Sequence, residues 1–210
     1  ENMIQVFDFI EKNFYGAIND YLNGEAVMSA YNISKIEKTI DSVSGSWHTD
    51  DLGRKINLFL CVKGDGSMPT AYLPGTHKKK YFPNILVNLR HAQINNFNKK
   101  KDKYFLSYKD KDCVLFDANG LHRGVYEKDG TSDRIVYQMQ FVNIKKIYEL
   151  GFKKTPKLFV YKNSKPIFRE QPVNDMYEID EKLVDKFLKF KFLRKEFIQQ
   201  KDKKNFYYLK

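Results

Sequence analysis

Cysteine is scarce in this chain, since its 210 residues include only Cys61 and Cys113. The two lie far apart, each within an apolar stretch, and they lack the paired spacing of a cysteine metal site. We therefore expect both to be reduced residues of the core, which is typical of a cytoplasmic protein.

Long apolar runs are missing as well. No run reaches the roughly 18 residues that a membrane-spanning helix needs, so the sequence predicts no transmembrane segment. The first residues, ENMIQVFDFIEKN, also lack the basic start and the apolar stretch of a signal peptide.

Acidic residues are in deficit. The chain has 37 lysines and arginines against 26 acidic residues, a formal net charge of +11. Lysines are concentrated in NKKKDK (98–103) and in the C-terminal third. A basic surface attracts nucleic acid, anionic lipid or small anionic substrates, although solvated lysines alone would also explain the charge. Hydrophobic residues at 42% and aromatic residues at 15% are typical of a globular domain.

Apolar periodicity predicts one helix followed by short strands. Apolar residues recur at three- and four-residue steps over 3–22, and Gly24 marks the end of that helix. The expected strands cover residues 26–36, 55–63 and 69–77, with three more inside 111–142. Many short strands separated by turn signals favour a β-sandwich or barrel, so the expected fold class is mainly β with flanking helices.

Two segments stand apart from these strands. The basic, Asn-rich stretch 88–103 predicts an excursion loop. Residues 179–198 have helical apolar spacing with lysines between, which fits a helix packed on the domain or, alternatively, one lying on a membrane surface. We expect a single domain over 1–210, with a core of about 25–142 and a C-terminal helical extension of about 145–210.

The stretch SGSWHTDDLG contains a His-x-Asp pair, His48 and Asp50. Side chains alternate faces along a strand, so these two would share a face and supply two corners of a metal site. Further along, His122 begins a strand before the turn signal Asp129-Gly130. If the chain reverses there, Arg134 falls opposite His122 on a neighbouring strand.

Two histidines and one carboxylate on one face form the facial triad of non-haem Fe(II) oxygenases, which leaves three positions open. A keto acid can chelate such an iron while its far carboxylate meets an arginine. This chemistry fits the residues better than zinc hydrolysis, which needs one open position.

Several motifs together resemble the phytanoyl-CoA dioxygenase-like branch of the Fe(II)/2-oxoglutarate-dependent oxygenases. They are His48-Thr49-Asp50, then GDGSMPTAYLPGTH, then DCVLFDANGLHRGVYEKDGTSDR. The resemblance covers about residues 25–142 and implies a double-stranded β-helix (jelly-roll, cupin-like) core. Asp50 is present where related halogenases have a small residue, which favours hydroxylation.

The resemblance also implies roles for individual residues. Fe(II) would be bound by His48, Asp50 and His122, and the distal carboxylate of 2-oxoglutarate by Arg134. The same co-substrate would be contacted by Thr49 and, on a looser alignment, by Asn57. His77, which ends the Pro-Gly-Thr-His stretch, is interpreted as a structural residue or as one that supports the metal ligands from behind.

The expected reaction is hydroxylation of a small, anionic metabolite with release of succinate and CO₂. The charge suggests a CoA or carrier-protein thioester, a nucleotide-sugar or a phosphorylated metabolite, with residues 88–103 or the C-terminal helix as a lid. The alternatives are a nucleic-acid demethylase of the same superfamily and a non-catalytic jelly-roll binding module. Nucleic-acid demethylases usually have a second arginine soon after the position of Arg134, and this chain has none, which argues against a nucleic-acid substrate. The complete triad together with Arg134 argues against a non-catalytic module. The sequence leaves the oligomeric state open.

Overall fold

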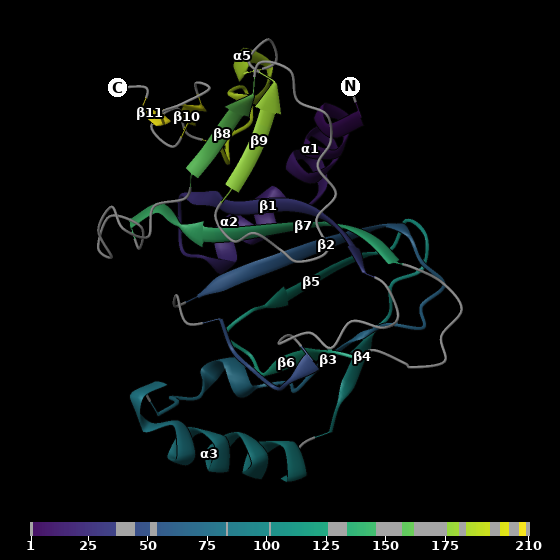
Figure 1. The fold of residues 1–210 in the computed structure, drawn as a ribbon, viewed down its shortest axis with the longest axis vertical. Coiled ribbons are helices and arrows are strands. Elements are labelled where there is room, and N and C mark those ends of the chain that lie inside the picture. Colours follow the sequence, from purple (N-terminus) through teal and green to yellow (C-terminus); the bar gives the residue numbers. More distant parts are fainter. Residues whose placement is uncertain are drawn as a thin grey trace. The chain divides into compact units, whose positions relative to one another are not determined.

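The computed structural model consists mainly of β-strands with few helices (Figure 1). It describes residues 2–36, 45–50, 54–82, 84–100, 102–125, 134–145, 157–161, 176–180, 184–193, 198–201 and 206–208. The chain divides into two compact units, one of residues 1–34 and 137–210 and one of 35–136. The expected assignment of the whole chain to a single domain stays a prediction. Within the described residues, no helix has the length and apolarity needed to cross a bilayer.

The first unit begins with two helices and a long strand. Helices α1 (Asn2–Asn13) and α2 (Tyr15–Tyr21) occupy the predicted helix 3–22, which is interrupted at Phe14. Asn23 and Gly24 then adopt positive φ angles of 59° and 112°, and this left-handed turn ends the helix where the glycine predicted it. Strand β1 (Ala26–Ile36) follows with the predicted bounds.

A cluster of phenylalanine rings forms the core beside α1. Phe7 makes edge contacts with Phe187, Phe190 and Phe192 at centroid distances of 5.3–5.5 Å. The backbone of this C-terminal stretch turns tightly, because Phe190 and Leu193 donate their N–H groups to carbonyls three residues earlier. Among the described residues of 179–198, α5 (Val184–Phe187) is the only α-helix and both ends of the range are extended, so the predicted continuous helix is wrong. The apolar residues of this stretch are spaced so that Phe187, Phe190 and Phe192 all contact the Phe7 ring from a tight turn.

The rest of the described C-terminal part forms a four-stranded sheet of order β11-β10-β8-β9. Strand β8 (Lys157–Tyr161) pairs in parallel with β9 (Met176–Asp180) and with β10 (Ile198–Lys201), and β11 (Phe206–Tyr208) is antiparallel to β10. The expected helical extension over 145–210 is thus wrong, because strands predominate in its described residues.

The second unit contains the strands that carry the predicted site. Strand β2 (Lys55–Lys63) pairs with β5 (Cys113–Asp117) in antiparallel register, with Ile56 opposite Asp117. A three-stranded sheet has the order β4-β3-β6 and consists of Tyr104–Leu106, Thr70–Tyr72 and His122–Gly124. The strand expected over 55–63 is confirmed, whereas only three residues of 69–77 are extended. Both cysteines are free thiols, Cys61 buried and Cys113 half-buried.

The predicted hairpin between His122 and Arg134 does not form. Tyr72 of β3 lies opposite His122 in the register of β6. Arg134 begins β7 (Arg134–Asn143), which belongs to a different sheet from β6. The turn signal Asp129-Gly130 lies outside the described residues. Two residues equally far from a turn pair with each other only if their strands are neighbours in one sheet. Here the neighbour of β6 is β3, and β7 belongs to another sheet.

The stretch expected to be a loop over 88–103 is largely a helix, α3 (Val87–Lys100). Its inward face has helical spacing, with Arg90, Ile94 and Phe97 at steps of four and three residues. Ile94 is buried against Leu73 and Leu121, and Phe97 packs against the same cluster. A single strip of apolar residues among many asparagines is a weak sequence signal, which explains the incorrect prediction.

Candidate metal centre

His48 and His122 lie opposite each other on two short extended segments. Each residue donates its backbone N–H to the carbonyl oxygen of the other at 3.0 Å, an isolated antiparallel bridge. The imidazole centroids are 4.3 Å apart as a consequence. Backbone pairing thus brings together two histidines that are 74 positions apart in the sequence.

Both imidazoles are held in the same way. The Nδ1 of His48 lies 2.7 Å from the carbonyl oxygen of Ser46, and the Nδ1 of His122 lies 2.9 Å from that of Gly120. A carbonyl oxygen can only accept, so each Nδ1 carries a proton, and it is Nε2 that has the lone pair for a metal when the ring is neutral. These two carbonyls are the orienting groups that the sequence leaves unidentified.

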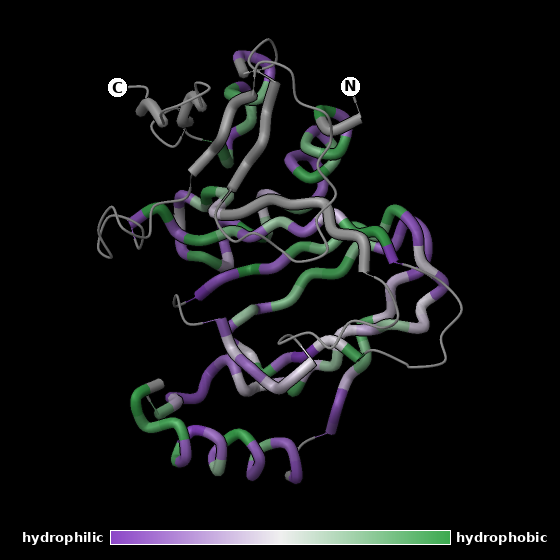
Figure 2. The backbone as a smooth tube through the Cα atoms, viewed as in Figure 1, coloured by the Kyte–Doolittle hydropathy of each residue, from purple (hydrophilic) through white to green (hydrophobic). Residues whose placement is uncertain are grey.

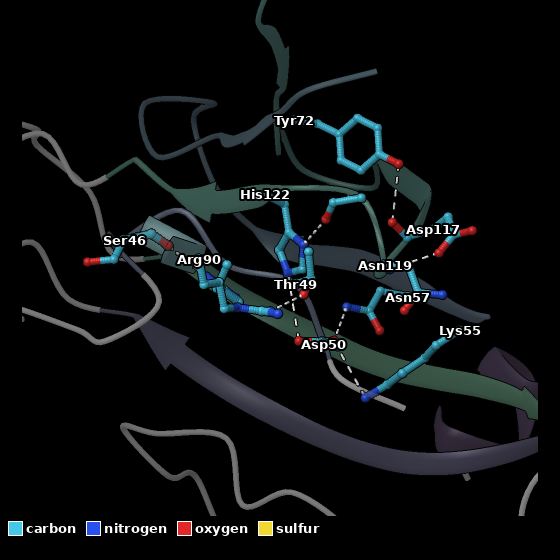
Figure 3. Close-up of polar contacts among 12 residues, drawn as sticks. Ser46, Thr49, Asp50, Lys55, Asn57, Tyr72, Arg90, Asp117, Asn119 and His122 are labelled. Atoms are coloured by element: carbon cyan, nitrogen blue, oxygen red, sulfur yellow. Dashed lines mark hydrogen bonds and ion pairs between the residues drawn. The ribbon is translucent and has the colours of Figure 1, made fainter. Parts of the chain in front are cut away.

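Asp50 provides the third ligand atom, and its two carboxylate oxygens have different surroundings (Figure 3). Oδ1 lies 4.0 Å from Nε2 of His122. Oδ2 lies 3.5 Å from the Lys55 ammonium and accepts a hydrogen bond of 3.4 Å from the Asn57 amide. Lys55 and Asn57 are both buried and occupy alternate positions of β2. One oxygen is therefore directed to the histidines, and the other is held by the strand.

Burial and charge set the protonation of the ligands. Burial alone would raise the pKa of Asp50, but the Lys55 ammonium and the two histidines bring that pKa below its ordinary value. Burial, assisted by the neighbouring His48, lowers the pKa of His122 to about 4. At neutral pH the centre thus offers an ionised carboxylate and a neutral buried imidazole, the forms that bind metal.

The Pro-Gly-Thr-His stretch fixes the strand that carries His122. Thr76 is fully buried, and its hydroxyl accepts the N–H of Leu121 at 2.8 Å while donating to the carbonyl of Leu73 at 2.5 Å. Gly75 enters this turn with φ of 75°, which favours glycine. His77 lies in the 3₁₀ turn Thr76–Lys78 and is not part of the His48–Asp50–His122 cluster. Its supporting role stays a prediction.

Arg90 reaches the metal centre from α3 and was missed in the sequence because its segment was expected to be a loop. Its guanidinium donates to the hydroxyl of Thr49 at 2.7 Å and to the carbonyl of Phe82 at 2.9 Å. It also lies over the Tyr81 ring, 5.5 Å from the centroid. Thr49, buried between two candidate ligands, is thereby linked to the helix.

Lys55 is the second residue that the sequence analysis missed. A lysine at the first position of a strand resembles a surface residue, and only the pairing of β2 with β5 places it beside Asp50. Asn57 contacts the Asp50 carboxylate through its amide nitrogen, and its Oδ1 is buried without a hydrogen-bond partner. The predicted contact of Asn57 with the co-substrate stays a prediction.

Arg134 is buried and lies in the same unit. Its guanidinium donates to the carbonyl of Met68 and stacks over the Tyr108 ring at 4.4 Å from the centroid. The Tyr108 hydroxyl in turn donates to Thr70, which pairs with Gly124 two residues after His122. Arg134 therefore connects to the strand of His122 through β3 rather than directly across a hairpin.

The three candidate ligands converge. One ligand atom each of His48, Asp50 and His122 lies within 4.8 Å of the other two. Two imidazole nitrogens with free lone pairs and one carboxylate form a donor set suited to a first-row divalent metal, Fe(II) included. Asp51, the neighbouring carboxylate, lies outside the described residues.

Comparison with known proteins gives no match to a family model and none among curated proteins. Solved structures are similar. The epimerase SnoN in complex with Fe3+, alpha ketoglutarate and nogalamycin RO aligns with a TM-score of 0.50 at 12% identity over 75% of this chain and 66% of that one. EctD from S. alaskensis with bound Fe aligns with a TM-score of 0.50 at 12% identity, over 65% of this chain and 56% of EctD.

AviO1 from Streptomyces viridochromogenes Tue57 is also similar, with a TM-score of 0.41 and 17% identity over 59% of this chain. This chain spans about half of AviO1, 54% of its length. At such identities the likeness to SnoN and EctD is one of fold. The expected fold class, mainly β with flanking helices and a jelly-roll core, is confirmed.

Proposed function

We propose that this protein is an Fe(II)- and 2-oxoglutarate-dependent oxygenase that hydroxylates a small anionic metabolite. The observation that carries the proposal is the convergence of His48, Asp50 and His122, with both Nδ1 atoms held by carbonyls. Structures that share the fold bind iron, and one of them binds alpha ketoglutarate as well. The motifs favour the phytanoyl-CoA dioxygenase-like branch.

The metal and co-substrate, once bound, supply the activation of O₂ that drives hydroxylation. The reaction balances as substrate C–H plus O₂ plus 2-oxoglutarate, giving alcohol, succinate and CO₂. His48, Asp50 and His122 would hold the metal from one side, a donor set that suits a ferrous ion which also takes a keto acid. Lys55 and Asn57 hold Oδ2 of Asp50, so Oδ1 is the oxygen that would be offered to the metal.

Cationic side chains would hold the anionic groups. We assign the distal carboxylate of 2-oxoglutarate to Arg134, whose burial favours a charge-assisted, bidentate contact. Thr49 lies between two ligands and can contact the co-substrate, with Arg90 fixing its hydroxyl. The substrate classes stay those that the basic charge favours: a CoA or carrier-protein thioester, a nucleotide-sugar or a phosphorylated metabolite.

Metal and co-substrate binding test the proposal directly. The apo-protein would be mixed anaerobically with Fe(II) and 2-oxoglutarate, and the visible charge-transfer band of the chelate recorded. We expect the band in the unmodified protein and its loss in His48→Ala, whereas His91→Ala, an exposed change on α3, should retain it. Asp50→Asn should abolish iron binding and Asp51→Asn should not. An unmodified protein without the band, or a His48→Ala variant that keeps it, would contradict the proposal.

The substrate class needs a second experiment. Succinate release would be followed with a panel that represents each of the three anionic classes, and hydroxylated product identified by its mass increase of one oxygen atom. We expect one class to raise succinate formation well above the uncoupled rate. Binding of single-stranded nucleic acid that weakens with salt, together with demethylation, would favour the demethylase alternative instead.

A further inference from the structure

Five large apolar side chains are exposed within eight consecutive residues. They are Phe82, Ile85, Leu86, Val87 and Leu89, and we call them the apolar ridge. Ile85 is 88% exposed, and the other four are 41–51% exposed. Figure 2 shows the ridge as a hydrophobic stretch leading into α3. Single exposed apolar residues are normal, but a contiguous group marks an interaction surface.

The fold itself does not cover the ridge. Helix α3 turns Arg90 and Ile94 inward, the first onto Thr49 and the second into the core. Leu89 lies on a side of α3 away from that inward face, whereas Val87 is the first residue of the helix, one turn before Arg90, and both remain exposed. The 3₁₀ turn η3 (Asn84–Leu86) precedes the helix and presents Ile85 to solvent. The ridge is therefore left open by the same packing that positions Arg90.

The charge around the ridge has one sign. Lys78, Lys79 and Lys80 are exposed and lie just before it in the chain. Residues 66–101 include seven lysines and arginines and no aspartate or glutamate. Exposed apolar side chains next to clustered lysines are typical of protein segments that bind anionic lipid surfaces.

Two other occupants fit this surface less well. Four of the five ridge residues are aliphatic, and Phe82 is the one aromatic residue among them. Single-stranded nucleic acid is bound largely through stacking of bases on aromatic side chains, so this surface suits it less well. A two-fold contact between copies of the chain would bring equivalent surfaces together, and the three lysines of each copy would then repel those of the other. An anionic membrane satisfies both the apolar residues and the lysines.

We propose that residues 78–82 and 84–89 form a docking surface for an anionic membrane. The apolar ridge enters the boundary between lipid headgroups and acyl chains, and Lys78, Lys79 and Lys80 contact the lipid phosphates. This association is peripheral and reversible. It does not depend on the proposed oxygenase activity, because neither the ridge nor these lysines belong to the candidate metal centre.

Vesicle co-sedimentation tests the proposal with the full chain. We expect binding to vesicles that contain phosphatidylserine and little binding to phosphatidylcholine alone, with affinity falling as salt rises. Ile85→Gln should weaken binding roughly ten-fold, because a full aliphatic side chain leaves the membrane. Val62→Gln changes an exposed valine on β2 and should leave binding unchanged.

A charge variant separates lysine contacts from total charge. Changing Lys78, Lys79 and Lys80 together to glutamine should weaken binding on the order of 100-fold, at about five-fold for each lysine. The matched control changes three exposed lysines elsewhere, Lys63, Lys103 and Lys109. Equal losses in both triple variants would overturn the proposal. So would binding to neutral vesicles alone, or a dimer in solution that Ile85→Gln dissociates.

Discussion

Replacing Lys55 with methionine tests the electrostatics of the centre most directly. The ammonium lies 3.5 Å from Oδ2 of Asp50, and the side chains of Lys55 and Asp50 are 7% and 22% exposed. At that separation the Coulomb energy is about 1 kcal/mol with the dielectric of water and about 5 kcal/mol with an effective dielectric of about 20. Because Asp50 is partly exposed, we expect a coupling of about 2 kcal/mol.

The free energy of unfolding that Lys55→Met removes should depend on pH. Lys55 lowers the pKa of Asp50 against the opposing effect of burial, so Lys55→Met should raise it. A carboxylate whose folded pKa is depressed stabilises the protein above its unfolded pKa of about 3.9, and that contribution is lost as pH falls through the folded pKa. The stability gap between the unmodified apo-protein and the variant should therefore be largest at pH 7 and narrow below about pH 4.

Urea unfolding of Lys55→Met, Asp50→Asn and the double variant provides the measurement. Methionine keeps most of the apolar stem of the lysine, so the packing change is small. The double-mutant cycle then isolates the pair. A coupling below about 0.3 kcal/mol, or a gap that stays as large well below pH 4 as it is at pH 7, would refute the reasoning.

Three further outcomes follow from the geometry around the centre. Burial lowers the pKa of His122 to about 4, so its imidazole should titrate near that pH by NMR. About 3 kcal/mol of stability should then be lost as pH falls from about 6.5 to 4, because the unfolded state takes up the proton first. Titration near 6.5 would contradict this expectation. Gly120→Ala would place a Cβ in steric conflict with the Tyr72 hydroxyl, so about 1–3 kcal/mol should be lost in urea unfolding and Co(II) affinity should fall. Gly16→Ala has open space around the added Cβ and should not destabilise the protein. Arg90→Met should raise amide exchange in α3 about ten-fold through loss of charged hydrogen bonds, and unchanged exchange would show that Arg90 does not hold the helix.

The convergence of the candidate ligands could be anticipated because the evidence for them is local and chemical. A histidine and an aspartate two positions apart share a face in any extended segment, and His48 and Asp50 need only one more partner. Lys55 and Arg90 could not be found in this way, because their roles arise from strand pairing and from a helix with a weak pattern. The placement of Arg134 failed for the same reason: register across a sheet is set by non-local partners, which the turn signal did not reveal.

The buried lysine changes the charge of the centre in a way that bears on the proposed co-substrate. Asp50 contributes one negative charge and Lys55 one positive charge, so the pair is neutral before a divalent metal binds. In a facial triad without such a lysine, the carboxylate would offset one of the two charges of the metal. Here both metal charges are left for the incoming ligand, in surroundings where burial strengthens the interaction. The chelating end of 2-oxoglutarate brings one negative charge to this excess, while its distal carboxylate is assigned to Arg134, and a neutral chelator brings none. The position of Lys55 therefore favours binding of metal together with an anionic chelator over binding of metal alone.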